Sequence, residues 1–347
     1  EQPLDQLLSH LKENKPLSTV PNLIYLEENK VIRNPKSEAL PYDQLVCPTF
    51  DQLPLEKYLM PYPVLPYMSS RGCYWGKCTF CTHSFIYDSH YRKENEVRVA
   101  EELDHLSKKY KTKYFTFSDE AISPNAFNRM STEILKRGVD MRALGMLKFE
   151  SSEKESPELF DDIYRAGFLM LFFGLESAND RILSIIDKGC DQETERAVLK
   201  HSSEAGIWNH LYLFFGFPTE ERFEAEDTIQ FTIENSEVES GIIHSVGQSI
   251  FALEKDSAIY HNPAKFKIDR IVQDPERDMA IVFDYEINTG MPREEVMDVY
   301  ENFNSVIEKH FPSRQIWNYL SREHFLLYLD HYGKEEILNM ASTGVAP

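Results

Sequence analysis

The chain has 347 residues, and its 42% of hydrophobic residues provide enough apolar material for one large domain or two of ordinary size. The 37 Lys and Arg residues are outnumbered by 57 Asp and Glu residues, and the net charge of −20 at pH 7 argues against a general nucleic-acid groove. The longest dense apolar stretch, 168–173, is far shorter than the roughly 18 residues of a membrane span, and the first twenty residues lack the apolar core of a secretory signal.

Residues 1–62 are expected to form an N-terminal segment of hairpin and linker. Two short apolar runs, 23–25 and 31–32, flank the polar residues 27–30, and this pattern predicts a hairpin. Prolines punctuate the residues that follow, as is typical of a linker.

Residues 63–265 repeat a strand-then-helix pattern, with an apolar run every ~25–40 residues and an amphipathic segment between successive runs. One helix is expected to start at Ser123-Pro124, where Ser caps and Pro takes the first helical position, and another at Ser156-Pro157. Six strands alternating with helices favour a partial parallel barrel over a doubly wound sheet, although periodicity alone fits both. The expected strands are 63–68, 114–117, 141–149, 168–174, 211–217 and 242–253.

Residues 266–347 are expected to form a helical segment that caps the barrel. Apolar residues at helical spacing run from Val296 to Val306, and aromatic residues follow from Trp317 to Tyr328. Core packing is the simpler explanation of this aromatic density, and a ligand site is the alternative. The fold class expected for the chain is therefore α/β, a partial (β/α)6 TIM-type barrel with an N-terminal linker and hairpin and a C-terminal helical cap.

Three of the five cysteines, Cys73, Cys78 and Cys81, lie within nine positions, so a disulfide framework is disfavoured and a cytoplasmic protein is expected. Thiolates are soft ligands that suit iron–sulfur clusters or zinc. Three on one short loop can hold three corners of a four-iron cluster, and because no fourth cysteine is close in sequence, one iron would stay open for chemistry.

Each of these residues also has a plainer interpretation. The three thiols could bind a structural zinc ion with His83 or Cys47 as the fourth ligand, although paired Cys-x-x-Cys knuckles are missing. Cys47 and Cys190 are more typical of buried apolar residues than of ligands. Asp119 and Glu120 could simply cap the next helix, because carboxylates favour helix N-termini.

The stretch Ser70-Arg-Gly-Cys-Tyr-Trp-Gly-Lys-Cys-Thr-Phe-Cys81 resembles the cluster loop of radical S-adenosylmethionine (SAM) enzymes, which follows the first strand of their βα barrel. Three residues usually separate the first two cysteines in that family, and four separate them here. The final Cys-x-aromatic-Cys piece matches, and the wider phrase resembles the cobalamin-binding subgroup in particular.

The resemblance also implies residues that contact SAM. Asp119 and Glu120 end the second expected strand, where the family often has Gly-Gly-Glu facing the amino group of SAM. Glu176 and Ser177 end the fourth strand, where the family has polar groups near the ribose and carboxylate. A carboxylate directly after a buried strand needs a partner, which favours a functional role for Glu176.

Four further positions follow from the same resemblance. Gly216 and Pro218 end the fifth strand and resemble the glycine-containing segment beneath the adenine. The backbone at Phe80 would meet the adenine itself, and Lys148 is a candidate for the SAM carboxylate.

The resemblance implies a radical SAM enzyme whose cofactors are a [4Fe–4S] cluster, SAM and, through a domain absent from this chain, cobalamin. In that family the cluster reduces SAM to methionine and a 5′-deoxyadenosyl radical, which abstracts hydrogen from the substrate. The favoured outcome is cobalamin-type modification of an unactivated carbon, such as C-methylation. The implied partners are a small-molecule or peptide substrate and an electron donor such as flavodoxin or ferredoxin.

Two alternatives stay open. One is a cobalamin-free radical SAM epimerase or cyclase that acts on a peptide or small metabolite, and the other is a non-catalytic Fe–S or zinc-binding protein. Methylthiotransferases of tRNA share the cluster loop, but the acidic balance and the lack of a basic tail argue against nucleic acid as a partner.

Overall fold

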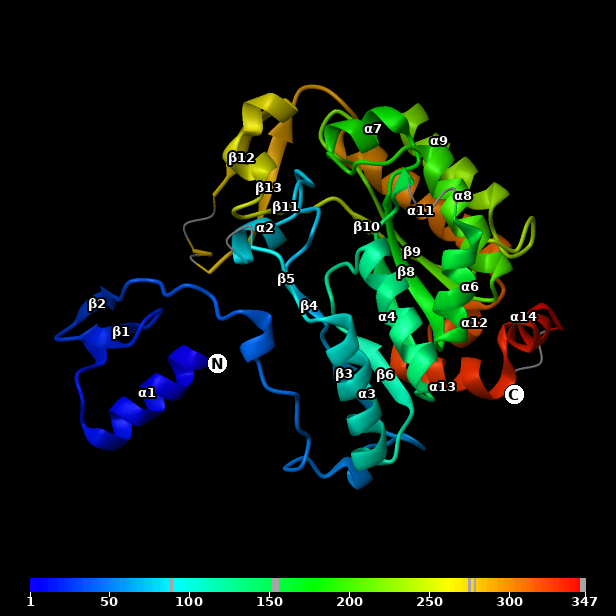
Figure 1. Cartoon of the computed structure of the whole chain (residues 1–347). Helices are drawn as coiled ribbons and strands as arrows, with labels where there is room; N and C mark the ends of the chain where they lie inside the picture. Colours follow the sequence, from blue (N-terminus) through cyan, green and yellow to red (C-terminus); the bar gives the residue numbers. More distant parts are fainter. Residues whose placement is uncertain (88–89, 152–155, 274–275, 278, 344–347) are drawn as a thin grey trace. The chain divides into compact units, whose positions relative to one another are not determined.

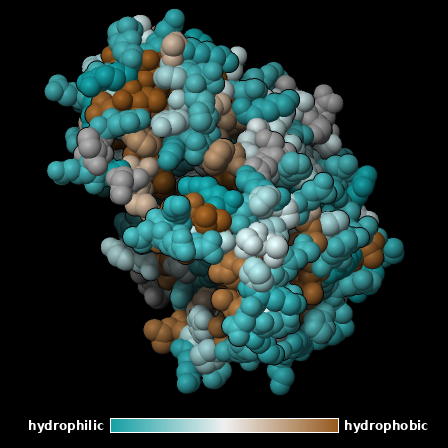
Figure 2. Space-filling view, turned by 90° about the vertical axis from the view of Figure 1, so that its left-hand side faces the viewer, coloured by the Kyte–Doolittle hydropathy of each residue, from teal (hydrophilic) through white to brown (hydrophobic). Residues whose placement is uncertain are grey.

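The computed structural model of the protein describes residues 1–87, 90–151, 156–273, 276–277 and 279–343. The chain divides into two units, Glu1–Cys47 and Pro48–Pro347. Among the described residues, no helix is both long enough and apolar enough to cross a membrane. On the face drawn in Figure 2, hydrophilic residues predominate and hydrophobic residues form scattered patches.

The N-terminal unit contains helix α1 (Gln2–Glu13) and an antiparallel hairpin of β1 (Ile24–Glu27) and β2 (Lys30–Arg33). The hairpin expected from the sequence is confirmed. Its two turn residues, Glu28 and Asn29, have φ angles of 47° and 62°, the positive values that the tightest hairpin turns require. Two short 3-10 turns complete the unit, Leu17–Thr19 and Tyr42–Gln44.

The larger unit is built on a six-stranded sheet in which all neighbouring strands are parallel (Figure 1). The spatial order of its strands, β10-β9-β8-β7-β6-β3, follows the chain, so each connection leads to the adjacent strand. Because β3 and β10 are its two edges, the described part of the sheet is a partial barrel, and the expected fold class is confirmed. The strands are β3 (Val64–Tyr67), β6 (Tyr114–Phe117), β7 (Arg142–Leu147), β8 (Phe168–Glu176), β9 (Trp208–Phe215) and β10 (Ser245–Ile250).

Helices cover both faces of this sheet. Successive residues of a strand point to opposite faces: Asn209 donates a hydrogen bond of 2.8 Å to the Leu199 carbonyl in α8, whereas Trp208 packs against Phe325 in α13. Figure 1 shows α3, α4, α6 and α8 side by side on the first face. The longer helices are α3 (Glu96–Tyr110), α4 (Pro124–Arg137), α6 (Pro157–Arg165), α8 (Gln192–Glu204), α9 (Arg222–Glu234), α11 (Arg293–His310), α13 (Arg322–Tyr332) and α14 (Lys334–Thr343).

The expected helix starts at Pro124 and Pro157 are confirmed, and the Ser123 hydroxyl caps α4 by accepting from the Ala126 N–H. Capping by Asp119 or Glu120 was therefore the wrong alternative for this helix. Shorter elements lie between the main ones: β4 (Ser70–Arg71), β5 (Arg92–Lys93), α2 (His83–Ile86), α7 (Asp180–Ile185), α10 (Ala258–His261), α12 (Arg314–Trp317) and the 3-10 turns Leu55–Lys57 and Pro263–Phe266.

The segment after the barrel is only partly helical, which differs from the expectation for residues 266–347. Strands β12 (Ile268–Val272) and β13 (Val282–Ile287) form an antiparallel sheet with β11 (Leu253–Glu254). Exposed and half-buried residues alternate strictly along β13, the pattern of a strand that lies over a core with one face in water.

Candidate active site

The three clustered thiols lie on the cysteine loop, residues 72–81, which follows β3 and β4. Parallel barrels carry their active sites at the carboxyl ends of the strands, and β3 delivers the chain to that end. The buried carboxylate of Asp119, at the end of β6, accepts bonds from the Ser69 N–H (3.0 Å), the Ser69 hydroxyl (2.7 Å) and the Ser70 hydroxyl (2.5 Å). Asp119 therefore fixes the entry to the cysteine loop, although burial raises its pKa.

A second support comes from residues 185–190, here called the 185–190 turn, which follows α7. The Thr79 N–H donates to the Ile186 carbonyl at 2.9 Å, and the Trp75 indole N–H donates to the Asp187 carbonyl at 2.7 Å. The Trp75 ring lies directly on Gly189: a Cβ there would be 2.3 Å from the ring, and the φ angle of 73° also favours glycine. The cysteine loop is thus attached to the chain that follows β8.

The thiols of Cys73, Cys78 and Cys81 are half-buried and form no disulfide. Burial raises the pKa of Cys78 and raises that of Cys81 to about 12, while the His83 N–H donates to the Cys81 sulfur at 3.5 Å. Within the described ranges, no three His, Cys, Asp or Glu side chains are grouped tightly enough to hold one metal ion. The thiolates of a four-iron cluster bind different iron atoms, and three thiols on one short loop are a donor set that fits such a cluster.

Glu120 and His83 form an ion pair beside this loop. The Glu120 carboxylate lies 2.8 Å from His83 Nε2, and the Tyr87 hydroxyl donates to it at 3.4 Å. The hydrogen bond that the Glu120 carboxylate accepts from His83 raises the pKa of His83, against the effect of burial. His83, the alternative zinc ligand, therefore has its Nε2 directed to a carboxylate.

The partner that Glu176 was expected to need is Lys188. The Oε1 atom of Glu176 lies 2.9 Å from the Lys188 ammonium, and Glu176 has a φ angle of 63° at the end of β8. Burial is the largest single influence on the pKa of Lys188 and lowers it, but the charge of Glu176, the nearby thiols and the hydrogen bond to Glu176 together raise it by more, so the net change is upward. Ser177, by contrast, is buried with its hydroxyl 3.2 Å from that of Thr228 in α9.

Lys148 follows β7 and also reaches the cysteine loop. Its ammonium donates to the Phe149 carbonyl at 2.9 Å and lies 4.3 Å from the centre of the Trp75 ring, a cation–π distance. Burial lowers its pKa. Phe80, near the other end of the loop, packs edge-to-face on Phe214 of β9 with ring centres 5.2 Å apart.

The segment after β9 is held from several sides. The Gly216 N–H donates to the buried Glu220 carboxylate at 2.6 Å, and the Tyr285 hydroxyl of β13 donates to the Gly216 carbonyl at 3.1 Å. Gly216 has a φ angle of 84°, and a Cβ there would lie 2.7 Å from Val296 of α11. Burial raises the pKa of Glu220 to about 8.

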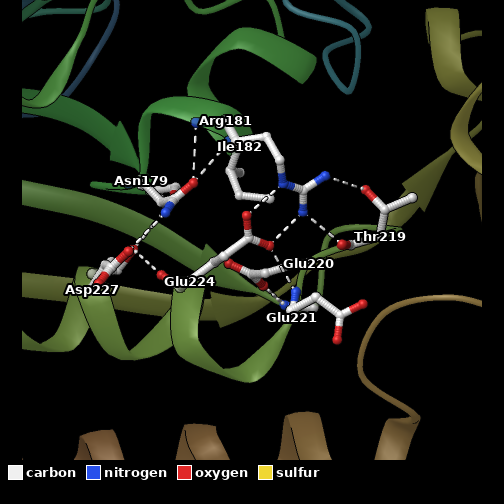
Figure 3. A network of polar contacts seen from close by, with 11 residues as sticks. Asn179, Arg181, Ile182, Thr219, Glu220, Glu221, Glu224 and Asp227 are labelled. Atoms are coloured by element: carbon white, nitrogen blue, oxygen red, sulfur yellow. Dashed lines mark hydrogen bonds and ion pairs between the residues drawn. The ribbon is translucent and has the colours of Figure 1, made fainter.

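Arg181 links the segments that follow β8 and β9 (Figure 3). Its guanidinium contacts the Glu224 carboxylate and the Thr219 carbonyl, while Asn179 caps α7 and donates to Asp227 at 2.7 Å. Charged guanidinium–carboxylate bonds of this kind fix both position and orientation. The ends of β8 and β9 are therefore held as one polar network.

The structure thus brings the ends of β3, β6, β7 and β8 to the cysteine loop, by hydrogen bonds or ring contacts. Residues 67–232 match the radical SAM superfamily. This segment, slightly less than half of the chain, is therefore similar to a radical SAM domain. Lys188, Gly189 and Glu220 were not proposed from the sequence. Glu220 directly follows Gly-Phe-Pro-Thr at the end of the fifth expected strand, and this position in the sequence could have indicated its role.

Two curated relatives of the radical SAM domain are named as methyltransferases. An uncharacterized methyltransferase of Pyrococcus horikoshii is 29% identical over 232 residues, covering 65% of this chain and 49% of the relative. The bacteriochlorophyllide d C-12(1)-methyltransferase of Chlorobaculum tepidum is 28% identical over 177 residues, covering 50% and 38%. The match therefore spans about half or less of each relative.

Solved structures of radical SAM proteins share the fold. The cobalamin-dependent S-adenosylmethionine radical enzyme OxsB aligns over 99% of this chain and 61% of its own, with a TM-score of 0.69 and 16% identity. The radical S-adenosylmethionine methyltransferase TsrM of Kitasatospora setae aligns over 100% and 77%, with a TM-score of 0.64 and 15% identity. Because the identities are only 16% and 15%, this similarity shows a shared fold alone.

Proposed function

We propose that this chain is the radical SAM part of an enzyme that modifies an unactivated carbon, with C-methylation as the favoured outcome. The observation that carries the proposal is the cysteine loop itself. Three thiols on one loop lie at the carboxyl end of a partial barrel, and both Asp119 and the 185–190 turn hold that loop in place. A loop used only for packing would not need two separate polar supports.

Cys73, Cys78 and Cys81 are the proposed ligands of a [4Fe–4S] cluster. When bound, such a cluster supplies the electron for reductive cleavage of SAM and offers an open iron to it. The role of the chain is then to bind and orient SAM and to exclude water from the site. Its proposed contacts are Phe80, Glu120, Lys148, Glu176, Gly216 and Pro218.

Asp119 and Ser177 receive different roles in this proposal. Both carboxylate oxygens of Asp119 accept hydrogen bonds from Ser69 or Ser70, and the Ser177 hydroxyl is buried beside Thr228. Groups that are satisfied in this way position their neighbours, so we assign Asp119 to the cysteine loop and Ser177 to the join with α9.

The methylation outcome draws its support from the relatives. Both curated relatives are named methyltransferases, and the two aligned structures are of a cobalamin-dependent enzyme and of a methyltransferase. By this analogy cobalamin would be supplied from outside residues 1–347. The proposed partners are a small-molecule or peptide substrate and a low-potential electron donor of the flavodoxin or ferredoxin kind.

The test is anaerobic reconstitution of the purified chain with iron and sulfide. We expect about four irons per chain and cleavage of SAM to 5′-deoxyadenosine under reduction. Each of Cys73→Ala, Cys78→Ala and Cys81→Ala should lose both properties. Cys190→Ala is the matched control, because Cys190 is also half-buried but lies outside the cysteine loop, and it should keep the iron.

Three results would distinguish the proposal from its alternatives. A colourless protein with one zinc ion, unable to cleave SAM, would leave only the metal-binding alternative. Cleavage of SAM with methyl transfer only when cobalamin is supplied would support methylation. An epimerised or cyclised product formed without cobalamin would support the cobalamin-free alternative instead.

A further inference from the structure

A buried lysine paired with a half-buried glutamate lies beside the cysteine loop, and packing alone does not explain this pair of charges. Lys188 is only 6% exposed, and its ammonium is 2.9 Å from the Glu176 carboxylate. Replacing such a pair with apolar residues is often neutral or stabilising, so a buried pair is weak support for stability as its purpose.

The backbone makes room for this pair. Gly174 of β8 faces it: a Cβ at this position would lie 2.4 Å from Glu176 Oε1 and 2.8 Å from Lys188 Nζ. Any other residue at 174 would therefore displace the two charges. Lys188 itself belongs to the 185–190 turn, whose neighbouring carbonyls at Ile186 and Asp187 bind the cysteine loop.

The other titratable groups around the pair leave its charges in place. Glu195 is fully buried, and its Oε2 has no hydrogen-bond partner. Burial raises its pKa and thereby favours the protonated, uncharged form of this carboxyl. The Cys190 thiol lies 3.7 Å from Glu195 Oε1, and burial raises the pKa of this thiol as well. Lys148, the other nearby cation, has a pKa lowered by burial.

The cation of the pair lies in the part of the chain that contacts the cysteine loop. Lys188 stands between Asp187, whose carbonyl accepts from the Trp75 indole, and Gly189, on which the Trp75 ring lies. The Ile186 carbonyl accepts from the N–H of Thr79, the residue after Cys78. Because Lys188 is buried, water screens its charge only weakly at the loop.

We infer that the buried Lys188–Glu176 pair sets the reduction potential of a cluster bound by the cysteine loop. The inference rests on the function proposed above. Reduction adds one electron, from a low-potential one-electron donor, to the cluster, and no bond forms or breaks in that step. A nearby buried cation stabilises the added negative charge and raises the potential, while a nearby anion lowers it.

The test measures the midpoint potential of the reconstituted cluster by spectroelectrochemistry without SAM or substrate. Lys188→Gln should shift the potential to more negative values, and Glu176→Gln should shift it to more positive values. The double variant should lie between the two single variants. Because the double variant leaves no unpaired buried charge, it should fold and its midpoint potential can be measured even if Lys188→Gln alone fails to fold.

Lys200→Gln is the matched control, since it removes one lysine charge from the exposed surface of α8 and should leave the potential unchanged. Equal potentials in all variants, or shifts of the same sign in both single variants, would overturn the inference, because a merely structural pair predicts no opposite shifts. A wild-type chain that binds no cluster would instead overturn the proposed function.

Discussion

The two ends of the parallel sheet are filled in opposite ways. At the amino end, Trp208 and Met170 pack with Phe325 and Leu326 of α13 in an apolar cluster. At the carboxyl end, the strands finish in buried or half-buried charged groups that bind one another or the cysteine loop. Apolar burial at the amino end therefore stabilises the sheet. Burial of polar and charged groups at the carboxyl end instead lowers the free energy of unfolding.

The largest expected effect at the amino end follows from Trp208→Ala. Trp208 is fully buried, lies 4.8 Å from the Phe325 ring and donates to the Ser245 hydroxyl at 2.9 Å. Removing it should lower the free energy of unfolding by about 3–5 kcal/mol. Urea unfolding measures the loss, and iron binding by the folded fraction should persist. Loss of iron from folded protein would show that the two ends are not independent.

An intermediate effect is expected from Asp119→Ala at the carboxyl end. The substitution leaves the Ser69 and Ser70 donors buried without their acceptor, at a cost of about 1–3 kcal/mol. Iron incorporation should fall by more than this cost suggests, because the entry to the cysteine loop is released. Asp119→Asn keeps one carbonyl oxygen and should retain more iron. Full iron content in Asp119→Ala would contradict the positioning role.

The smallest effect is a pH dependence at Glu220. Burial raises the folded-state pKa of this carboxyl from 4.5 to about 8, so the folded chain binds more protons than the unfolded chain between these values. Stability should therefore decrease as pH rises from 4.5 to about 8. Glu220→Gln should flatten this part of the pH profile of Tm, whereas Glu226→Gln, at an exposed position of α9, should leave it unchanged. A wild-type profile that rises with pH there would exclude the buried, protonated carboxyl.

The contrast between the two ends also explains what the sequence could predict. Periodicity in apolar residues is a local property, so the strands, the parallel fold and the hairpin were accessible. The expected strand 211–217 nevertheless begins three residues earlier, at Trp208, because Asn209 and His210 are buried polar residues inside β9. Burial there depends on partners in α8 and β10 that no sequence window contains.

Side-chain partners at the carboxyl end were harder to predict for the same reason. A need for a partner at Glu176 was foreseen, but Lys188 lies twelve residues further on in a turn whose path is set by Gly189 and Trp75. Asp119 could equally have faced a ligand or a neighbouring loop, and only the tertiary structure directs it to Ser69. Strands β12 and β13 were missed because their charged residues weaken the apolar signal.

The contacts at Gly216 bear on where this chain could be divided. Tyr285 and Val296, which hold Gly216 from two sides, both lie beyond residue 232, where the family match ends. A fragment limited to the matched residues would lack both the Tyr285 hydrogen bond and the Val296 contact that hold the backbone at Gly216. The structural unit is therefore larger than the segment that matches the family, and shortened versions intended for engineering should extend at least through α11.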